Sequence, residues 1–328
     1  MLKVLRAAAS ACALVATLTF VAPVRADDID AGDANPVIAG LLADQADAVG
    51  EVAAPLWKYR DADLQAAVDA ALRRLHLDRA AESRRLAVAL VDTTDADRPR
   101  VAAVNGDLMM YAASLPKIAI LFAAFDMAER GRLKIDGGVE ESLTAMIRVS
   151  SNVEATANIH RVGVENIARA LMSPRYRFYD PDRNGGLWVG KDYGKAGLWQ
   201  RDPLHSLSHG ATPMQVARFY YLLQRDELVS PAASRRMKAI LGDPGINHKF
   251  VKGLRGVDPN ASLCRKSGTW GTFHSDSALV EHDGRSYVAV ALSNDARGGE
   301  WLSDLIVAFD EIVAVRPPAR FETAGRRN

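Results

Sequence analysis

The chain has 328 residues, of which 48% are hydrophobic and 25% are charged. This composition supplies enough apolar surface for a sizeable core and excludes the disordered, collagen-like and fully transmembrane classes. The 41 Lys and Arg residues nearly balance the 40 Asp and Glu residues. The sequence therefore carries no electrostatic signature of a protein that binds nucleic acid or a membrane surface through basic residues.

The first 26 residues have the pattern of a secretory signal peptide. Lys3 and Arg6 precede an apolar run over 7–21, and Val24-Arg25-Ala26 supplies the cleavage positions. The run is too short and too rich in Ala for a membrane span. We therefore expect a periplasmic or secreted protein with no stable membrane span in its mature form; an uncleaved N-terminal anchor is the alternative.

Cysteine usage agrees with a fold that is held together by its core alone. Only Cys264 remains after removal of the predicted signal peptide, which contains Cys12. No intramolecular disulfide can then form, although the expected compartment is oxidising. Cys264 lies in an alternating stretch typical of a strand, so we interpret it as a packed strand residue and not as a nucleophile.

The N-terminal half begins with a leader over 27–60, whose order the sequence leaves open. Apolar residues spaced i, i+3, i+4 predict an amphipathic helix over 61–77, and two strand patterns at 85–92 and 101–105 predict a hairpin. A strongly apolar helix is predicted over 114–129, with a proline in its first turn. Further helical patterns lie at 139–149, 164–171, 212–226, 230–241 and 301–315, and strand patterns at 261–269, 273–281 and 286–293. Thr212 and Ser230, each followed by a proline, are the predicted N-caps of two of these helices.

Residues 176–199 form a Gly- and aromatic-rich segment without a regular pattern, which in a compact domain is more often functional than incidental. Strands at both ends flank a central block of helices. This order predicts an α+β fold, in which the N- and C-terminal parts form an antiparallel sheet flanked by helices and an all-helical subdomain is inserted. The expected division is a signal peptide (1–26), the leader (27–60), a catalytic domain (61–316) and a polar tail (317–328). Within the domain, the α/β part comprises 61–112 and 242–316, and the helical part 113–241.

The sequence Ser114-Leu115-Pro116-Lys117 places a lysine three residues after a serine at the predicted start of the apolar helix. Three residues is just under one helical turn, so the amine is predicted to reach the hydroxyl. A lysine whose pKa is lowered by burial can take the serine proton and activate the serine as a nucleophile. The helix N-terminus adds positive partial charge where an oxyanion would form. The S-x-x-K spacing occurs about once by chance in a chain of this length. The inference of a nucleophile therefore rests on the position of the motif at the start of a helix and not on its presence alone.

Two further motifs follow. Ser150-Ser151-Asn152 ends a predicted helix and offers a hydroxyl for proton relay and an amide that can hold a substrate; an ordinary polar loop is the alternative interpretation. Lys266-Ser267-Gly268-Thr269 lies on a predicted strand and offers a second cation, a hydroxyl and a glycine where a substrate backbone can approach.

In this order, the three motifs resemble the pattern of class A β-lactamases and penicillin-binding proteins, and the flanking sequence resembles that family over about 61–315. The resemblance implies an acyl-serine mechanism. The implied roles are nucleophile for Ser114, base for Lys117, proton relay for Ser150, amide ligand for Asn152, carboxylate anchors for Lys266 and Ser267, and an oxyanion hole from the backbone N–H groups of Ser114 and Thr269.

The sequence departs from the family in three ways. Class A enzymes carry a loop glutamate that activates the deacylating water, but no Glu lies between Glu165 and Glu227. The loop has only aspartates, whose side chains are one methylene shorter, and this weakens the expectation of efficient β-lactam turnover. The two motif serines at 114 and 150 are only 36 positions apart, which implies an open cleft for a bulkier or polymeric substrate. In addition, Ser151 replaces the usual Asp of the S-D-N motif. The loop aspartates are Asp180, Asp182, Asp192 and Asp202.

Three hypotheses remain open. The first is an exported serine hydrolase that opens a β-lactam or related amide through an acyl-serine intermediate. The second is a D,D-peptidase-like penicillin-binding enzyme, or another amide or ester hydrolase, that acts on a peptidoglycan-like peptide and deacylates slowly. The third is a ligand-binding or sensor module without turnover. The presence of both Lys117 and Lys266 argues against the third, because a buried unpaired lysine is costly without a role.

The remaining histidines do not indicate a second site. His205 and His209 are spaced i, i+4, but they lie in a predicted loop and lack the H-E-x-x-H pattern. His274 is interpreted as a polar residue at the edge of the sheet. We therefore expect no metal and no cofactor, a small-molecule or peptide substrate, and a monomer.

Overall fold

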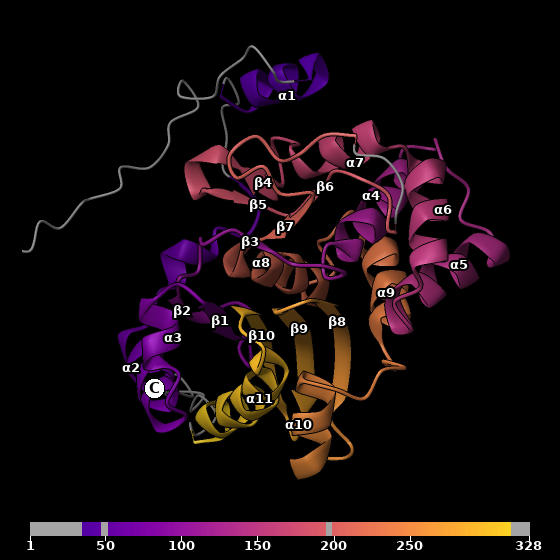
Figure 1. Cartoon of the computed structure of the whole chain (residues 1–328). Helices are drawn as coiled ribbons and strands as arrows, with labels where there is room; N and C mark the ends of the chain where they lie inside the picture. Colours follow the sequence, from indigo (N-terminus) through magenta and orange to yellow (C-terminus); the bar gives the residue numbers. More distant parts are fainter. Residues whose placement is uncertain (1–34, 47–51, 195–198, 316–328) are drawn as a thin grey trace, which may run out of the picture.

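The structure is a computed structural model that describes residues 35–46, 52–194 and 199–315 (Figure 1). The predicted signal peptide and the polar tail lie outside the described residues. Within the described ranges, no helix combines the length and the apolar character needed to cross a bilayer.

The central element is a five-stranded antiparallel sheet with the strand order β2-β1-β10-β9-β8. Strands from the two ends of the chain therefore lie side by side, as the purple β1 and the yellow β10 of Figure 1 show, and the predicted α+β class is confirmed. The predicted hairpin is confirmed as well, since Ala89 of β1 pairs with Ala103 of β2. The strands are β1 (Leu86–Asp92), β2 (Arg100–Val104), β8 (Ser262–Trp270), β9 (Phe273–His282) and β10 (Arg285–Asn294).

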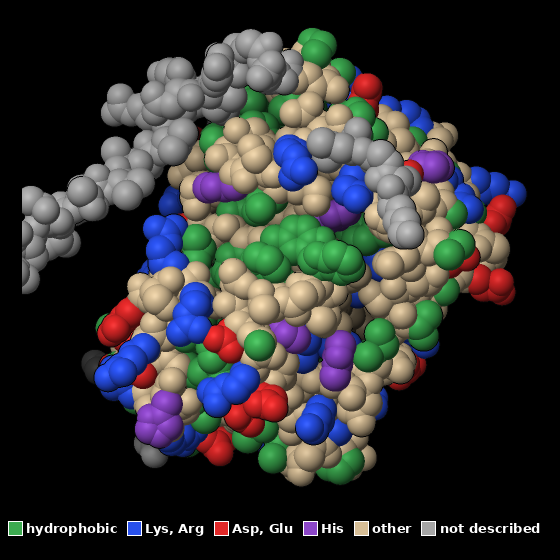
Figure 2. Space-filling view, viewed as in Figure 1, with side chains coloured by type: hydrophobic (Ala, Val, Ile, Leu, Met, Phe, Trp, Pro, Cys, Tyr) green, Lys and Arg blue, Asp and Glu red, His purple; other side chains and the backbone are tan. Residues whose placement is uncertain are grey.

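Both faces of the sheet are covered, which explains why β1 is apolar at every position before its final aspartate. Leu86, Val88 and Leu90 pack in a cluster with the helices on one face, and the alternate residues Ala87, Ala89 and Val91 pack in the cluster on the other face. The first face is covered by α2 (Ala62–Arg74), α3 (Asp78–Glu82), α10 (Phe250–Val257) and α11 (Gly298–Ala314). Basic and acidic side chains intermingle over this half of the molecule in the view of Figure 2.

The helical part packs around α4 (Lys117–Glu129), whose side chains from Lys117 to Phe125 are all buried. A helix that is apolar all round belongs in the interior, and here it contacts helices on several sides. Its neighbours and the remaining helices of this part are α5 (Gly137–Arg148), α6 (Asn152–Val162), α7 (Val164–Leu171), α8 (Pro213–Gln224) and α9 (Pro231–Leu241). Thr212 and Ser230 cap α8 and α9 through their side chains as the sequence predicts.

Three helices were not predicted, namely α3, α6 and α10. α3 has only five residues, α10 contains two glycines, and the buried face of α6 includes the polar residue Asn158, so apolar residues alone give no sustained period. The segment 176–199 also differs from the prediction of a structureless loop, because its described part contains two-residue strands. Gly186 has a φ of 152°, and a Cβ there would lie 1.9 Å from the Phe178 carbonyl oxygen, so only glycine permits this close pairing. The small strands are β3 (Met110–Tyr111), β4 (Tyr179–Asp180), β5 (Gly185–Gly186), β6 (Trp188–Val189) and β7 (His209–Ala211), and the 3₁₀ turn η3 spans Pro181–Arg183.

The leader packs against the helical part where it is described. It forms α1 (Pro36–Ala46) and the 3₁₀ turn η2 (Leu56–Tyr59). The Gln45 side-chain amide donates to the Met172 and Tyr179 carbonyl oxygens at 2.8 Å each. The buried Arg218 guanidinium donates to the Ala53 and Ala54 carbonyl oxygens. These contacts attach the leader to the backbone of the domain.

Candidate active site

Ser114 lies in a tight turn between β3 and α4, and not within the helix as the sequence predicted. The helix begins at Lys117, and the backbone bonds around the turn run from residue i to i−3, including Leu115 N–H to the Ala112 oxygen and Lys117 N–H to the Ser114 oxygen. Ala113 has a φ of 51°, which interrupts helical geometry before the serine. The Ser114 side chain is half-buried.

Lys117, which is fully buried, projects from the first turn of α4 into a polar cluster. Its Nζ donates to the Ser150 carbonyl oxygen at 2.7 Å and to Asn152 Oδ1 at 2.8 Å, and it lies 3.3 Å from both Ser150 Oγ and the Ser151 carbonyl oxygen. Among the described residues, Nζ makes no hydrogen bond to Ser114. The first and second motifs are thus joined through the lysine.

Ser150 connects the second motif to the third. Lys266 of β8 donates from Nζ to Ser150 Oγ at 2.9 Å and to the Ser267 carbonyl oxygen at 2.7 Å. Ser150 has a φ of 57°, which marks a sharp break between the end of α5 and α6. Ser151 is the N-cap residue of α6 and accepts from the Glu154 N–H. Its place in the motif therefore serves local structure.

Burial lowers the pKa values of both lysines. Lys117 is fully buried, and desolvation lowers its pKa to about 7. Burial also lowers the pKa of Lys266 well below its usual range, with a further contribution from the charge of Lys117. Two ammonium groups around one hydroxyl repel each other, so the cluster favours the loss of a proton near neutral pH.

The edge strand β8 brings the third motif against the Ser114 turn. A Cβ on Gly268 would lie 2.2 Å from the Ala112 carbonyl oxygen and 2.7 Å from the Ser114 nitrogen. Ser275, which pairs with Gly268, donates from Oγ to the same Ala112 oxygen at 2.8 Å. The backbones of Ser114 and Thr269, which we predicted to form an oxyanion hole, therefore lie close to each other.

Two residues of this site were not found from the sequence. His248 Nε2 lies 3.0 Å from Ser267 Oγ, and Lys249 donates from Nζ to the Gly268 carbonyl oxygen and to Thr269 Oγ1. Burial lowers the pKa of Lys249 to about 8 and that of His248 to about 4. Both precede α10, a helix that the sequence did not predict, and no motif spacing relates them to the K-S-G strand.

Tyr193 occupies the side of Lys117 that faces the long loop. Its ring centroid lies 4.5 Å from Lys117 Nζ, and its hydroxyl donates to the Ala113 carbonyl oxygen at 3.3 Å. The Tyr193 backbone is attached to α6 through Thr156 Oγ1. An aromatic ring and not a carboxylate therefore contacts the lysine here.

The four loop aspartates bind other partners. Asp180 and Asp182 both accept from Arg177. Asp192 pairs with His160 at 2.8 Å. Asp202 is buried and accepts from the Tyr179 hydroxyl and from the backbone N–H groups of Leu204, His205 and Leu207.

The other candidates from the sequence have structural contacts. His205 and His209 lie against different carbonyl oxygens, those of Asn184 and Lys191. His274 lies on β9 and pairs with Thr269 of the edge strand β8. Cys264 is buried on β8, and burial raises its thiol pKa to about 12, which agrees with the packed strand residue that was predicted.

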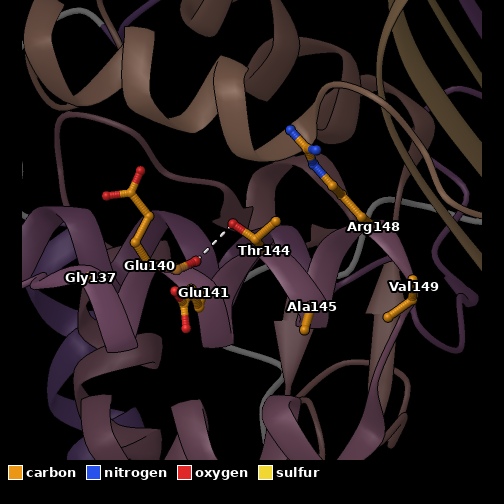
Figure 3. Close-up of a pocket in the computed structure, with 7 residues that line it drawn as sticks. All are labelled: Gly137, Glu140, Glu141, Thr144, Ala145, Arg148 and Val149. Atoms are coloured by element: carbon orange, nitrogen blue, oxygen red, sulfur yellow. Dashed lines mark hydrogen bonds between the residues drawn. The ribbon is translucent and has the colours of Figure 1, made fainter.

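A groove of about 510 Å³ runs along α5, the helix that precedes Ser150 (Figure 3). Its lining comes from α5 and the residue after it, and none of the predicted site residues lines it. The Thr144 hydroxyl on its wall donates back to the Glu140 carbonyl oxygen of the same helix. We assign the candidate site to the Ser114 region because the polar groups converge there and not in this groove.

Solved structures define the fold class. A β-lactamase from Sphaerobacter thermophilus is similar over 77% of this chain and 98% of its own, with a TM-score of 0.59 and 17% identity. PBP-A is similar over 77% of this chain and 97% of its own, with a TM-score of 0.54 and 19% identity. A substitution variant of PBP-A, solved as an acyl-enzyme complex with penicillin G, has a TM-score of 0.53 over 77% of this chain and 98% of its own, at 19% identity. The chain thus has the fold of class A β-lactamases and PBP-A.

The family model described as "Beta-lactamase enzyme family" matches residues 137–309, more than half of the chain. The protein therefore belongs to the β-lactamase enzyme family, as its three motifs suggested. The matched range includes the second and third motifs but begins after Ser114 and Lys117. No curated protein sequence matches the chain.

Proposed function

We propose that the protein is an exported serine hydrolase that is acylated at Ser114 by β-lactams or related amides. One observation carries this proposal: Lys117 and Lys266, both buried and both with lowered pKa values, lie around the hydroxyl of Ser150. A buried amine that loses its proton near neutral pH is suited to act as a general base. The family membership and the fold support the same reaction class.

The proposed acylation step uses Lys117 as the base. Neutral Lys117 takes the proton of Ser114 Oγ while this oxygen forms a bond to the substrate carbonyl carbon. The backbone N–H groups of Ser114 and Thr269 stabilise the negative charge that develops on the carbonyl oxygen. The bond between carbon and the leaving nitrogen then breaks, and Ser150 passes the proton from Lys117 to that nitrogen. The product is an ester on Ser114, with Lys117 neutral again.

Substrate recognition is assigned to the edge strand. Lys266 and Ser267 would hold a substrate carboxylate, because an anion raises the proton affinity of the nearby amine and restores its charge. Asn152 would hold a substrate amide. His248 contacts Ser267 Oγ and adds a polar group to the same side of the site.

The contacts of the loop that carries the four aspartates favour slow hydrolysis of the ester on Ser114. Hydrolysis of the ester requires a base for water, yet the four loop aspartates bind other groups and Tyr193 contacts Lys117. The protein would then act as a D,D-peptidase-like penicillin-binding enzyme or as a hydrolase of another amide or ester. A β-lactamase with rapid turnover is the competing form.

Intact-protein mass spectrometry with penicillin G tests the proposal. Ring opening keeps both parts of the antibiotic attached, so acylation adds one whole penicillin mass. We expect a persistent adduct that maps to Ser114, is lost in Ser114→Ala and is retained in Ser83→Ala, which changes an exposed serine away from the site. Rapid decay of the adduct with product release would support the β-lactamase form instead. Unmodified protein after incubation with penicillins, cephalosporins and carbapenems would overturn acylation by β-lactams.

A further inference from the structure

A second cluster of chemically active side chains lies at the opposite end of β9 from the candidate active site. His282 is the last residue of β9, and Asp283 with Gly284 forms a two-residue turn to β10, both with positive φ values. Asp258 is the C-cap residue of α10 and lies against the same histidine. His282 is seven positions after Ser275 along β9, which at 3.4 Å per residue places the cluster about 24 Å from the Ser114 region.

One ring nitrogen of His282 has a defined partner. The side chain is only 4% exposed, and Nε2 lies 2.6 Å from Asp310 Oδ1 on α11. The Tyr287 hydroxyl donates to the same oxygen at 3.1 Å. Because a carboxylate accepts and does not donate, the proton of a neutral ring is held on Nε2. The other nitrogen, Nδ1, then carries a lone pair directed away from Asp310.

Nδ1 faces two further carboxylates without a hydrogen bond to either. It lies 2.8 Å from Asp258 Oδ2 and 3.7 Å from Asp283 Oδ2, yet it is a buried atom with no hydrogen-bond partner among the described residues. The short contact to Asp258 therefore lies off the direction in which a ring proton would donate. A lone pair and two carboxylate oxygens that converge without an intervening cation repel one another.

We propose that Asp258, His282 and Asp283 form a binding site for a divalent metal ion of the zinc class. The three donor atoms lie within 4.8 Å of one another. Zinc bound at about 2.0–2.2 Å to nitrogen and oxygen in tetrahedral geometry separates neighbouring donors by about 3.3–3.6 Å. The observed separations of 2.8 and 3.7 Å bracket this range. One imidazole and two carboxylates suit zinc or manganese, with water completing the coordination.

The surroundings complete the features of a metal site. Asp310 behind the imidazole corresponds to the carboxylate that commonly orients a metal-binding histidine. Asp258 accepts the Asn260 N–H with Oδ1, which leaves Oδ2 for the metal. Asp283 is 74% exposed and pairs with Arg285 at 3.2 Å, so its carboxylate can exchange that surface contact for the ion. Three aspartates against one arginine leave a net negative charge for a divalent cation to neutralise.

The ion would connect the end of α10 to the β9–β10 turn and, through His282, to α11. Such a connection stabilises the folded state because the three ligands come together only on folding. A chain with one cysteine among its described residues has no disulfide to supply this cross-link. The metal is assigned to stability and not to chemistry at Ser114.

The test uses the full chain without an affinity tag, stripped with EDTA and titrated with ZnCl₂ by calorimetry and thermal unfolding. We expect one zinc per chain and a rise in Tm of about 5 °C at a hundredfold excess over Kd. Asp258→Asn and His282→Gln should each lose both effects. His160→Gln is the matched control, because it removes the exposed His160–Asp192 pair and should leave the titration unchanged.

Two results would overturn the site. The first is wild-type protein that neither binds zinc nor changes its Tm up to millimolar ZnCl₂. The second is equal binding by the wild type and by a folded Asp258→Asn variant. Circular dichroism establishes that each variant is folded, and a variant that unfolds is replaced by Asp283→Asn at the exposed ligand.

Discussion

The side-chain nitrogen of Lys266 lies 2.9 Å from the hydroxyl oxygen of Ser150, on which the amine of Lys117 also converges at 3.3 Å. Two buried ammonium groups cannot share one hydroxyl without strong repulsion. The arrangement therefore favours a state in which one lysine is neutral, and a base is available before a substrate binds. A substrate carboxylate near Lys266 would restore the charge on that residue and leave Lys117 as the base.

The rate of acylation should rise with pH through neutrality. Burial lowers the pKa of Lys117 to about 7. The neutral amine is the reactive form, and its fraction increases as the pH rises through this pKa, so acylation should be slow at pH 5.5 and approach a plateau above about pH 8. Single-turnover labelling with a fluorescent penicillin measures this profile. A rate that is constant or decreases over this range would exclude Lys117 as the base.

Ser150→Ala should slow acylation while the protein remains folded. The variant removes the hydroxyl between the two lysines, and the loss of a proton relay lowers the rate about 10²- to 10⁴-fold. Ser230→Ala serves as the control, because it removes the N-cap of α9, which costs about 1 kcal/mol of stability, at a distance from the site. We expect the control to lower the unfolding midpoint and to keep the wild-type acylation rate. An equal rate in wild type and Ser150→Ala would remove Ser150 from the mechanism.

The sheet and the positions of the three motifs were predictable because local patterns encode them. Alternating or continuous apolar runs identified all five strands, and Ser-Pro and Thr-Pro pairs identified the starts of α8 and α9. The S-x-x-K and K-S-G motifs combine residue types that chemistry requires, so they were visible without a structure. The predicted start of α4 was three residues too early, because the residue types around Ala113 do not indicate its left-handed backbone conformation.

The contacts that complete the site come from tertiary structure and could not be read from periodicity. His248 and Lys249 reach β8 because the segment before α10 folds back against it. Tyr193 contacts Lys117 from a loop whose sequence shows aromatic content but no direction for any side chain. The metal-site residues are a further case, because Asp258 and His282 meet only when α10 packs beside the sheet.

Gly268→Ala should abolish acylation and destabilise the protein. The added Cβ would lie 2.2 Å from the Ala112 oxygen and 2.7 Å from the Ser114 nitrogen, both backbone atoms that cannot move aside alone. The strand must then separate from the Ser114 turn and displace the proposed oxyanion hole. Gly256→Ala is the control on α10, where a Cβ meets no atom within 4 Å, and helix propensity predicts a gain of about 0.5–1 kcal/mol. Normal labelling of Gly268→Ala by penicillin would contradict this role of the strand edge.

Asp276→Asn should be among the most destabilising single changes in the sheet. Asp276 is fully buried and accepts from Arg265 at 2.7 Å through both Nε and Nη2, and it also accepts the Phe250 N–H at the start of α10. Loss of the carboxylate leaves a buried guanidinium without its counter-charge, at a cost of about 3–5 kcal/mol. Arg265 also donates to the His248 carbonyl oxygen, so the segment that carries His248 should become more mobile when Arg265 loses its partner.

Urea unfolding of Asp276→Asn and of Glu311→Gln makes the comparison direct. Glu311 pairs with Arg74 on the surface at 2.7 Å, where both side chains are more than half exposed, so its loss should cost less than about 1 kcal/mol. The double variant Arg265→Met/Asp276→Leu should recover much of the stability lost in Asp276→Asn, since apolar replacement of both partners removes the unpaired charge. If the double variant were as unstable as the single one, the loss would come from the Phe250 N–H contact and not from an unpaired arginine.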